Sequence, residues 1–122
     1  MKNILTIDVE DYFQVENFKE HISYEEWEDY NCRAVESTEL ILNILNEYNV
    51  QATFFVLGWI AEKYPKLVTK ISRAGHEIAT HGYYHQLVYK QTKEEFARDL
   101  DKSISLLTDI TNQSILGYRA PS

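Results

Sequence analysis

Two groups of residues in this sequence have the types and spacing needed to bind a metal ion. His81 and His85 are four residues apart, and in a helical turn or compact loop this spacing directs both imidazoles to one side. In the acidic run at residues 8–11, Asp8 and either Glu10 or Asp11 can supply a general base and a third ligand. Such a ligand set leaves a position for water, whose pKa a divalent cation lowers toward about 7. The combination predicts a mononuclear metal-dependent hydrolase.

The pattern of apolar residues predicts alternating strands and helices that place these polar groups at strand ends. The predicted strands are residues 4–9, 52–56, 76–79 and 115–118. Helices are predicted to begin at Ser37 or Thr38, at Pro65 and after Thr92, and residues 12–35 are expected to form a long aromatic loop. The alternation favours parallel strands with helices outside, in an open sheet or part of a (β/α) barrel. In both folds the carboxyl ends of the strands meet at the functional face.

Length and composition limit the possible partners. The 122 residues fit one α/β domain over residues 1–122, and the net charge of −7 disfavours binding to nucleic acid. The single Cys32 excludes an internal disulfide and a cysteine-based zinc site. The apolar stretch before Asp8 is too short for a signal peptide or a membrane span, so we expect a cytoplasmic protein.

Four segments resemble the ordered motifs of the polysaccharide deacetylases, and most closely the branch associated with exosortase and exopolysaccharide gene clusters. They are Thr-Ile-Asp-Val-Glu-Asp-Tyr-Phe at residues 6–13, Ala-Thr-Phe-Phe-Val-Leu-Gly at 52–58, Gly-His-Glu-Ile-Ala-Thr-His-Gly-Tyr-Tyr-His at 75–85 and Gly-Tyr-Arg-Ala-Pro-Ser at 117–122. The resemblance extends over the whole chain. It implies a distorted (β/α) barrel that removes acetyl groups from N-acetylated polysaccharides or oligosaccharides by hydrolysing a carbon–nitrogen bond that is not a peptide bond.

The resemblance also implies a function for each motif residue. His81 and His85 correspond to ligands of one divalent metal, most often Zn²⁺, with Co²⁺, Ni²⁺ or Mn²⁺ as alternatives. Asp8 corresponds to the base that activates water, and Arg119 to the arginine that pairs with it. The backbone N–H of Ser122 corresponds to a donor for the tetrahedral oxyanion.

One departure from the family pattern concerns the third metal ligand. The family has two adjacent aspartates, base and then ligand, whereas Val9 follows Asp8 here and two further acids come next. Glu10 is the preferred ligand, because side chains two residues apart in a strand share a face. Asp11 is the alternative.

A second departure is that the later family motifs, which carry a pocket Asp/Trp segment and a Leu-x-His general acid, have no counterpart here. We therefore expect about the first half of the barrel, with exposed edges that favour self-association. Two alternatives to a polysaccharide deacetylase remain. The first is a small cyclic-amide hydrolase of the same fold, and the second is a non-catalytic module for carbohydrate binding or assembly.

Overall fold

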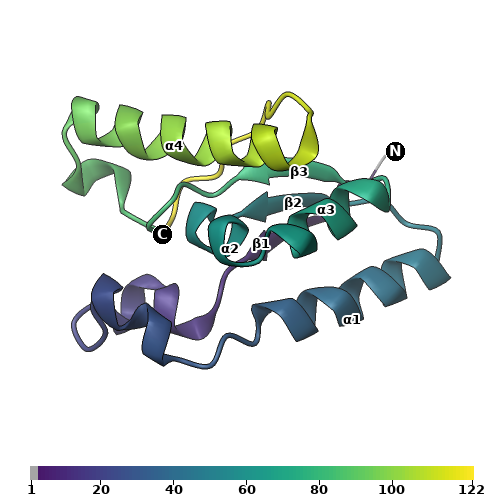
Figure 1. Ribbon diagram of the computed structural model, residues 1–122, viewed down its shortest axis with the longest axis horizontal. Helices are drawn as coiled ribbons and strands as arrows, with labels where there is room; N and C mark the ends of the chain where they lie inside the picture. Colours follow the sequence, from purple (N-terminus) through teal and green to yellow (C-terminus); the bar gives the residue numbers. More distant parts are fainter. Residues whose placement is uncertain (1–2) are drawn as a thin grey trace.

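A sheet of three parallel strands forms the centre of the protein in this computed structural model, which describes residues 3–122 (Figure 1). The strands are β1 (Thr6–Val9), β2 (Thr53–Val56) and β3 (Glu77–Thr80), in the order β1-β2-β3. Their register places Asp8 beside Phe55, and Phe55 beside Ala79. Because all three strands are parallel, their carboxyl ends lie along one edge of the sheet.

Four α-helices accompany the sheet in the described part of the chain: α1 (Ala34–Glu47), α2 (Gly58–Lys63), α3 (Pro65–Arg73) and α4 (Lys93–Thr111). The long helix α4 packs on β3, α2 and α3, and Figure 1 shows α4 above the strands and α1 below them. Parallel strands with helices outside confirm the predicted fold class, an α/β partial barrel. In residues 3–122 no helix is both long enough and apolar enough to cross a membrane.

The segment predicted as a fourth strand, residues 115–118, forms a single parallel bridge between Tyr118 and Thr80. Thr80 N–H donates to Gly117 O over 2.9 Å, and Arg119 N–H donates to Thr80 O over 3.0 Å. The prediction of a regular strand is therefore wrong. The bridge nevertheless brings Arg119 to the carboxyl end of β3.

Helix α1 begins earlier than its sequence suggests. Neither Ser37 nor Thr38 caps it, because the helix starts at Ala34 and its first amides donate to the carboxylate of Asp11. A carboxylate at a helix N-terminus is favoured by the exposed N–H groups and the helix dipole. The cap lies 23 positions away in sequence, so no local pattern could reveal it.

Residues 12–33 contain the 3₁₀ helices η1 (Tyr12–Gln14), η2 (Glu16–Phe18) and η3 (Tyr24–Asp29) rather than one continuous loop. Phe13 and Trp27 are buried, and their rings pack edge to face at 6.2 Å between centroids. Tyr12 and Phe18 are exposed. The segment therefore contributes Phe13 and Trp27 to the core, and in Figure 1 it lies at the carboxyl ends of the strands.

Gly58, at the start of α2, is a position where any side chain would collide with a buried ring. A Cβ built there would lie 2.5 Å from Tyr83 Cδ2 and 3.0 Å from Tyr83 Cα. We expect Gly58→Ala to lower the free energy of unfolding by about 1–3 kcal/mol, the usual cost of overpacking. Urea unfolding measures this loss, with the exposed helical substitution Ser105→Ala as control. A stability equal to wild type would show that Tyr83 can move aside.

Candidate metal centre

Glu10, His81 and His85 come together at the carboxyl edge of the sheet. One potential ligand atom from each lies within 4.8 Å of the other two. Glu10 Oε2 is 2.9 Å from His85 Nε2 and 3.5 Å from His81 Nε2. Both histidines are buried, and the Glu10 side chain is 20% exposed. The structure therefore brings together the two predicted histidines and the preferred carboxylate.

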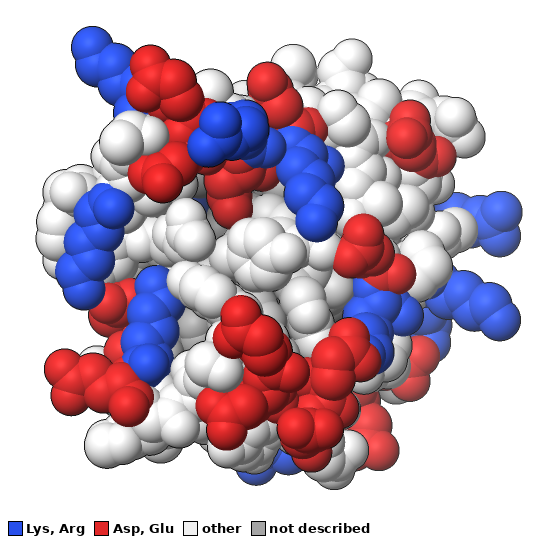
Figure 2. All heavy atoms as spheres, turned by 60° about the vertical axis from the view of Figure 1, so that its left-hand side comes forward, with Lys and Arg blue, Asp and Glu red and all other residues white. Residues whose placement is uncertain are grey.

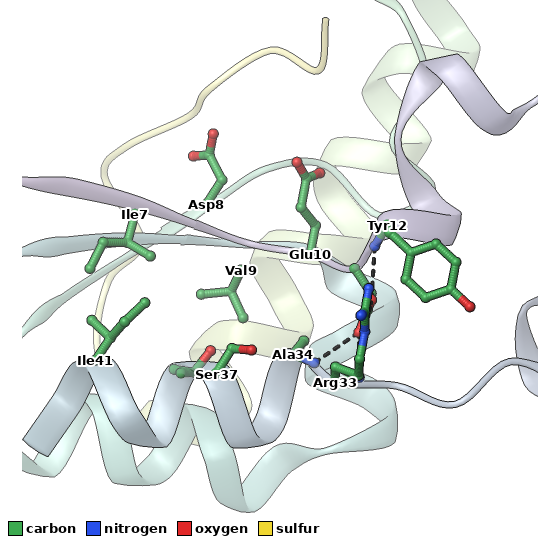
Figure 3. Close-up of a pocket in the computed structure, with 11 residues that line it drawn as sticks. Ile7, Asp8, Val9, Glu10, Tyr12, Arg33, Ala34, Ser37 and Ile41 are labelled. Carbon is green, nitrogen blue, oxygen red and sulfur yellow. Dashed lines mark hydrogen bonds and ion pairs between the residues drawn. The ribbon is translucent and has the colours of Figure 1, made fainter.

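Asp11, the alternative ligand, lies outside this cluster. Its Oδ2 accepts hydrogen bonds from the amides of Arg33 and Ala34, and its Oδ1 accepts one from Tyr12 (Figure 3). These contacts turn Asp11 away from the histidines and use both of its oxygens. Its place in the fold is that of a buried helix cap.

Strand geometry explains why Asp8 and Glu10 share a side. Figure 3 shows both carboxylates on one side of β1, while Ile7 and Val9 point the other way, toward α1. The alternation of side chains along a strand produces this arrangement. Apolar residues thus anchor the strand against its helix, and the acidic residues face the candidate site.

The turn that carries the histidines departs from regular secondary structure directly after β3. Gly82 has a φ of 77°, and His85, a non-glycine residue, has a φ of 54°. Asp99 in α4 supports the turn, since its carboxylate accepts from Tyr83 N–H at 2.8 Å and from Tyr84 N–H at 3.2 Å. Sequence reasoning missed Asp99 as a turn support, because its partners lie 15 and 16 residues away.

The two imidazoles are held in different ways. His81 Nδ1 lies 2.8 Å from the carbonyl oxygen of Arg119, which directs Nε2 into the cluster. Such a contact to the outer nitrogen is the usual way to fix a metal-binding histidine. His85 Nδ1 is buried and has no hydrogen-bond partner within residues 3–122. The His85 ring therefore lacks the outer contact that orients His81.

The charges in the cluster are strongly coupled. Burial alone would raise the pKa of Glu10, but its contacts with His81 and His85 outweigh burial and lower it to about 2. Burial would likewise lower the pKa of His81, yet the Glu10 carboxylate and the Arg119 carbonyl raise it. The Glu10 carboxylate is therefore ionised, as a metal ligand must be, and a cation bound beside it would displace the proton that the raised pKa of His81 favours.

The geometry of the cluster fits a small divalent cation. Bonds of about 2.0–2.1 Å to a tetrahedral ion separate neighbouring ligand atoms by roughly 3.3 Å. The distances from Glu10 Oε2, 2.9 Å and 3.5 Å, lie on either side of that value. Glu10 Oε2 is also buried and accepts no hydrogen bond of normal geometry from the described residues. A cation would satisfy this oxygen.

Arg119 holds Asp8 beside the cluster. One guanidinium nitrogen lies 2.6 Å from Asp8 Oδ1, and the other donates to Thr6 Oγ1 at 2.8 Å. The guanidinium also lies 4.2 Å from the centre of the Phe55 ring. The structure thus pairs Arg119 with Asp8, and it adds Thr6 and Phe55, two supports that sequence reasoning missed. Ser122 is exposed at the end of this segment.

His76 directly precedes β3, at the end of the strand away from the cluster, and has a structural function. Its ring is 6% exposed, and Nδ1 accepts a hydrogen bond from Ala52 N–H at 3.2 Å. An accepting nitrogen must be unprotonated, and burial lowers the pKa of His76. The unfolded chain therefore binds a proton more readily than the folded one near the unperturbed pKa of about 6.5.

This difference predicts a pH-dependent contribution of His76 to stability. The contribution is present above about pH 6.5 and is lost as the pH falls. Urea unfolding at about pH 7.5 and about pH 5.5 should therefore show a larger loss for wild type than for His76→Asn, which keeps an acceptor but does not titrate. The exposed His21→Asn variant is the control. Equal losses for wild type and His76→Asn would contradict this account.

Comparison with known proteins identifies a family model and several relatives that match the chain. The polysaccharide deacetylase family model matches residues 19–122. A peptidoglycan-N-acetylglucosamine deacetylase of Bacillus cereus is 36% identical over 87 residues, which are 71% of this chain and 32% of that protein. A peptidoglycan deacetylase of Helicobacter pylori is 33% identical over 81 residues, 66% of this chain and 28% of that protein. The chain thus spans less than a third of the length of these two relatives.

Solved structures agree with the fold. A protein from Mycobacterium smegmatis assigned to the polysaccharide deacetylases superposes with a TM-score of 0.78 at 30% identity, covering 97% of this chain and 42% of that one. A CE4 family pseudoenzyme from Bacillus anthracis superposes with a TM-score of 0.73 at 21% identity, covering 98% of this chain and 36% of that one. Because a pseudoenzyme shares the fold, activity has to be argued from the site. With the family model matching most of its length, this chain belongs to the polysaccharide deacetylase family.

Proposed function

We propose that Glu10, His81 and His85 bind one divalent cation and that this centre removes acetyl groups from an N-acetylated carbohydrate. The convergence of these three side chains is the observation that carries the proposal. Two imidazoles and one carboxylate suit Zn²⁺, and Co²⁺, Ni²⁺ or Mn²⁺ can occupy similar ligand sets. When bound, such a cation polarises an acyl oxygen and acidifies water.

Asp8 is the proposed general base. Its side chain is 33% exposed, so it can take a proton from water at the site. The 2.6 Å ion pair with Arg119 fixes the orientation of the carboxylate. Arg119 thereby orients the base, and Ser122 N–H is the proposed donor to the oxyanion that develops on the acetyl group.

The proposed substrate class is a glycan that contains N-acetylhexosamine. The names of the Bacillus cereus and Helicobacter pylori relatives specify peptidoglycan. For this chain we propose only that the substrate contains an N-acetylated sugar. The surface supports an uncharged ligand. On the face drawn in Figure 2, acidic side chains gather in the lower part and again near the top, where Lys and Arg lie among them, with an uncharged area between. A polyanion would meet like charges there. The exopolysaccharide branch and self-association through open edges remain predictions.

The activity is tested by acetate release from N-acetylglucosamine oligosaccharides in the presence of Zn²⁺. We expect Asp8→Asn to lower the rate by about 10²–10⁴-fold, the usual contribution of a general base. Zinc binding should persist, because Asp8 is not among the proposed ligands. Asp109→Asn, an exposed substitution in α4, is the matched control. Equal rates for wild type and Asp8→Asn would contradict the assignment of the base.

A further inference from the structure

A lysine from the aromatic segment reaches the main chain of the candidate metal centre. Lys19 Nζ donates to the carbonyl oxygen of His85 at 2.6 Å, across 66 positions of sequence. Lys19 follows η2, so this contact joins the segment after β1 to the turn after β3. It is a charge-assisted hydrogen bond, stronger than one between neutral groups.

His85 is the cluster residue that most needs such support. Its outer ring nitrogen has no partner among residues 3–122, in contrast to that of His81. Its φ of 54° is a left-handed conformation that costs a non-glycine residue energy unless its surroundings enforce it. A contact to the His85 carbonyl restrains the rotation of that peptide unit, and hence the direction from which the imidazole enters the cluster.

Lys19 is itself held in place. Its ammonium lies 2.6 Å from Glu16 Oε2, and the two side chains are about equally exposed, at 23% and 24%. The other oxygen of Glu16 is 3.1 Å from Lys90 Nζ, in the 3₁₀ helix η4 (Val88–Lys90). Lys19 and Lys90 therefore share one carboxylate partner. In the described structure only Lys19 also donates to His85 O.

We propose that Lys19 is a positioning residue for the metal centre, which it serves by fixing the main chain of His85. The inference rests on the proposed function, since it concerns the same ligand set. It adds that η2 and the histidine turn are coupled through one ammonium group. Outer partners of metal ligands typically contribute about 10–100-fold to metal affinity, and we expect Lys19 to fall in that range.

The test is a titration of the 122-residue chain with Co²⁺, followed by visible absorption. Lys19→Ala should weaken binding by about 10–100-fold and alter the absorption of the bound ion, which reports ligand geometry. Lys19→Arg keeps a cationic donor and should restore most of the affinity. Lys90→Ala removes an ion pair with the same Glu16 carboxylate and should leave affinity within about twofold of wild type, since outer-partner effects need contact with a ligand.

Thermal unfolding of the metal-free variants separates positioning from folding, because Lys19→Ala and Lys90→Ala should both remain folded at the temperature of the titration. Wild-type affinity in Lys19→Ala, or an equal loss in Lys90→Ala, would overturn the positioning function while leaving the proposed metal site intact. Failure of wild type to bind one Co²⁺ per chain would refute the metal site itself and the Lys19 proposal with it.

Discussion

Replacement of His81 or His85 by Ala is expected to lower the affinity of the chain for Zn²⁺ by at least about 100-fold. Loss of an outer partner already costs about 10–100-fold, and loss of a ligand removes a metal bond as well. Both imidazoles are buried, at 3% and 2% exposure, so solvent cannot readily replace them without rearrangement. Equilibrium dialysis with metal analysis measures the change.

The control for this experiment is His21→Ala, because His21 is exposed and lies outside the cluster. It should bind Zn²⁺ as wild type does. Unfolding of the metal-free variants verifies that the fold is retained, since His81→Ala also removes the contact with the Arg119 carbonyl. Zinc binding that survives both His81→Ala and His85→Ala would place the metal elsewhere.

Asp11→Ala is expected to lower the free energy of unfolding by about 1–3 kcal/mol without loss of metal affinity. The substitution removes a cap and leaves the amides of Tyr12, Arg33 and Ala34 without their acceptor. The Asp11 side chain is only 3% exposed, so water cannot fully replace it. Urea unfolding of the metal-free protein measures the loss.

Glu10→Gln provides the matched comparison, because it alters the neighbouring acid. It should reduce zinc affinity while removing no helix cap. The pair of variants therefore separates the metal ligand from the helix cap. If Asp11→Ala abolished zinc binding and kept wild-type stability, Asp11 would be the ligand and the assignment of Glu10 would be wrong.

The fold class and the cluster could be predicted because their determinants are local. Short apolar runs mark the three strands, Pro65 opens α3, and the Thr92 capping box opens α4. Parallel strands then bring residues 10, 81 and 85 to the carboxyl edge of the sheet, irrespective of the conformation of the loops. Strand alternation was enough to favour Glu10 over Asp11 as the residue on the side of Asp8.

The features that sequence reasoning missed depend on distant partners. Asp11 caps α1 from 23 positions away, and Lys19 reaches His85 across 66. Helix α2 is only six residues long and has no side-chain cap from which it could be predicted. The segment near Tyr118 looked like a strand because its apolar residues match one, yet pairing is limited to a single bridge with Thr80. Such contacts exist only once the chain has folded.

The central claim is that Glu10, His81 and His85 bind one divalent cation. Anomalous diffraction at the zinc edge from crystals grown with Zn²⁺ tests it most directly. We predict one peak, about 2.0–2.2 Å from a carboxylate oxygen of Glu10 and from Nε2 of each histidine. A peak bonded to Asp11, or zinc bound only at sites away from the two histidines, would contradict the account.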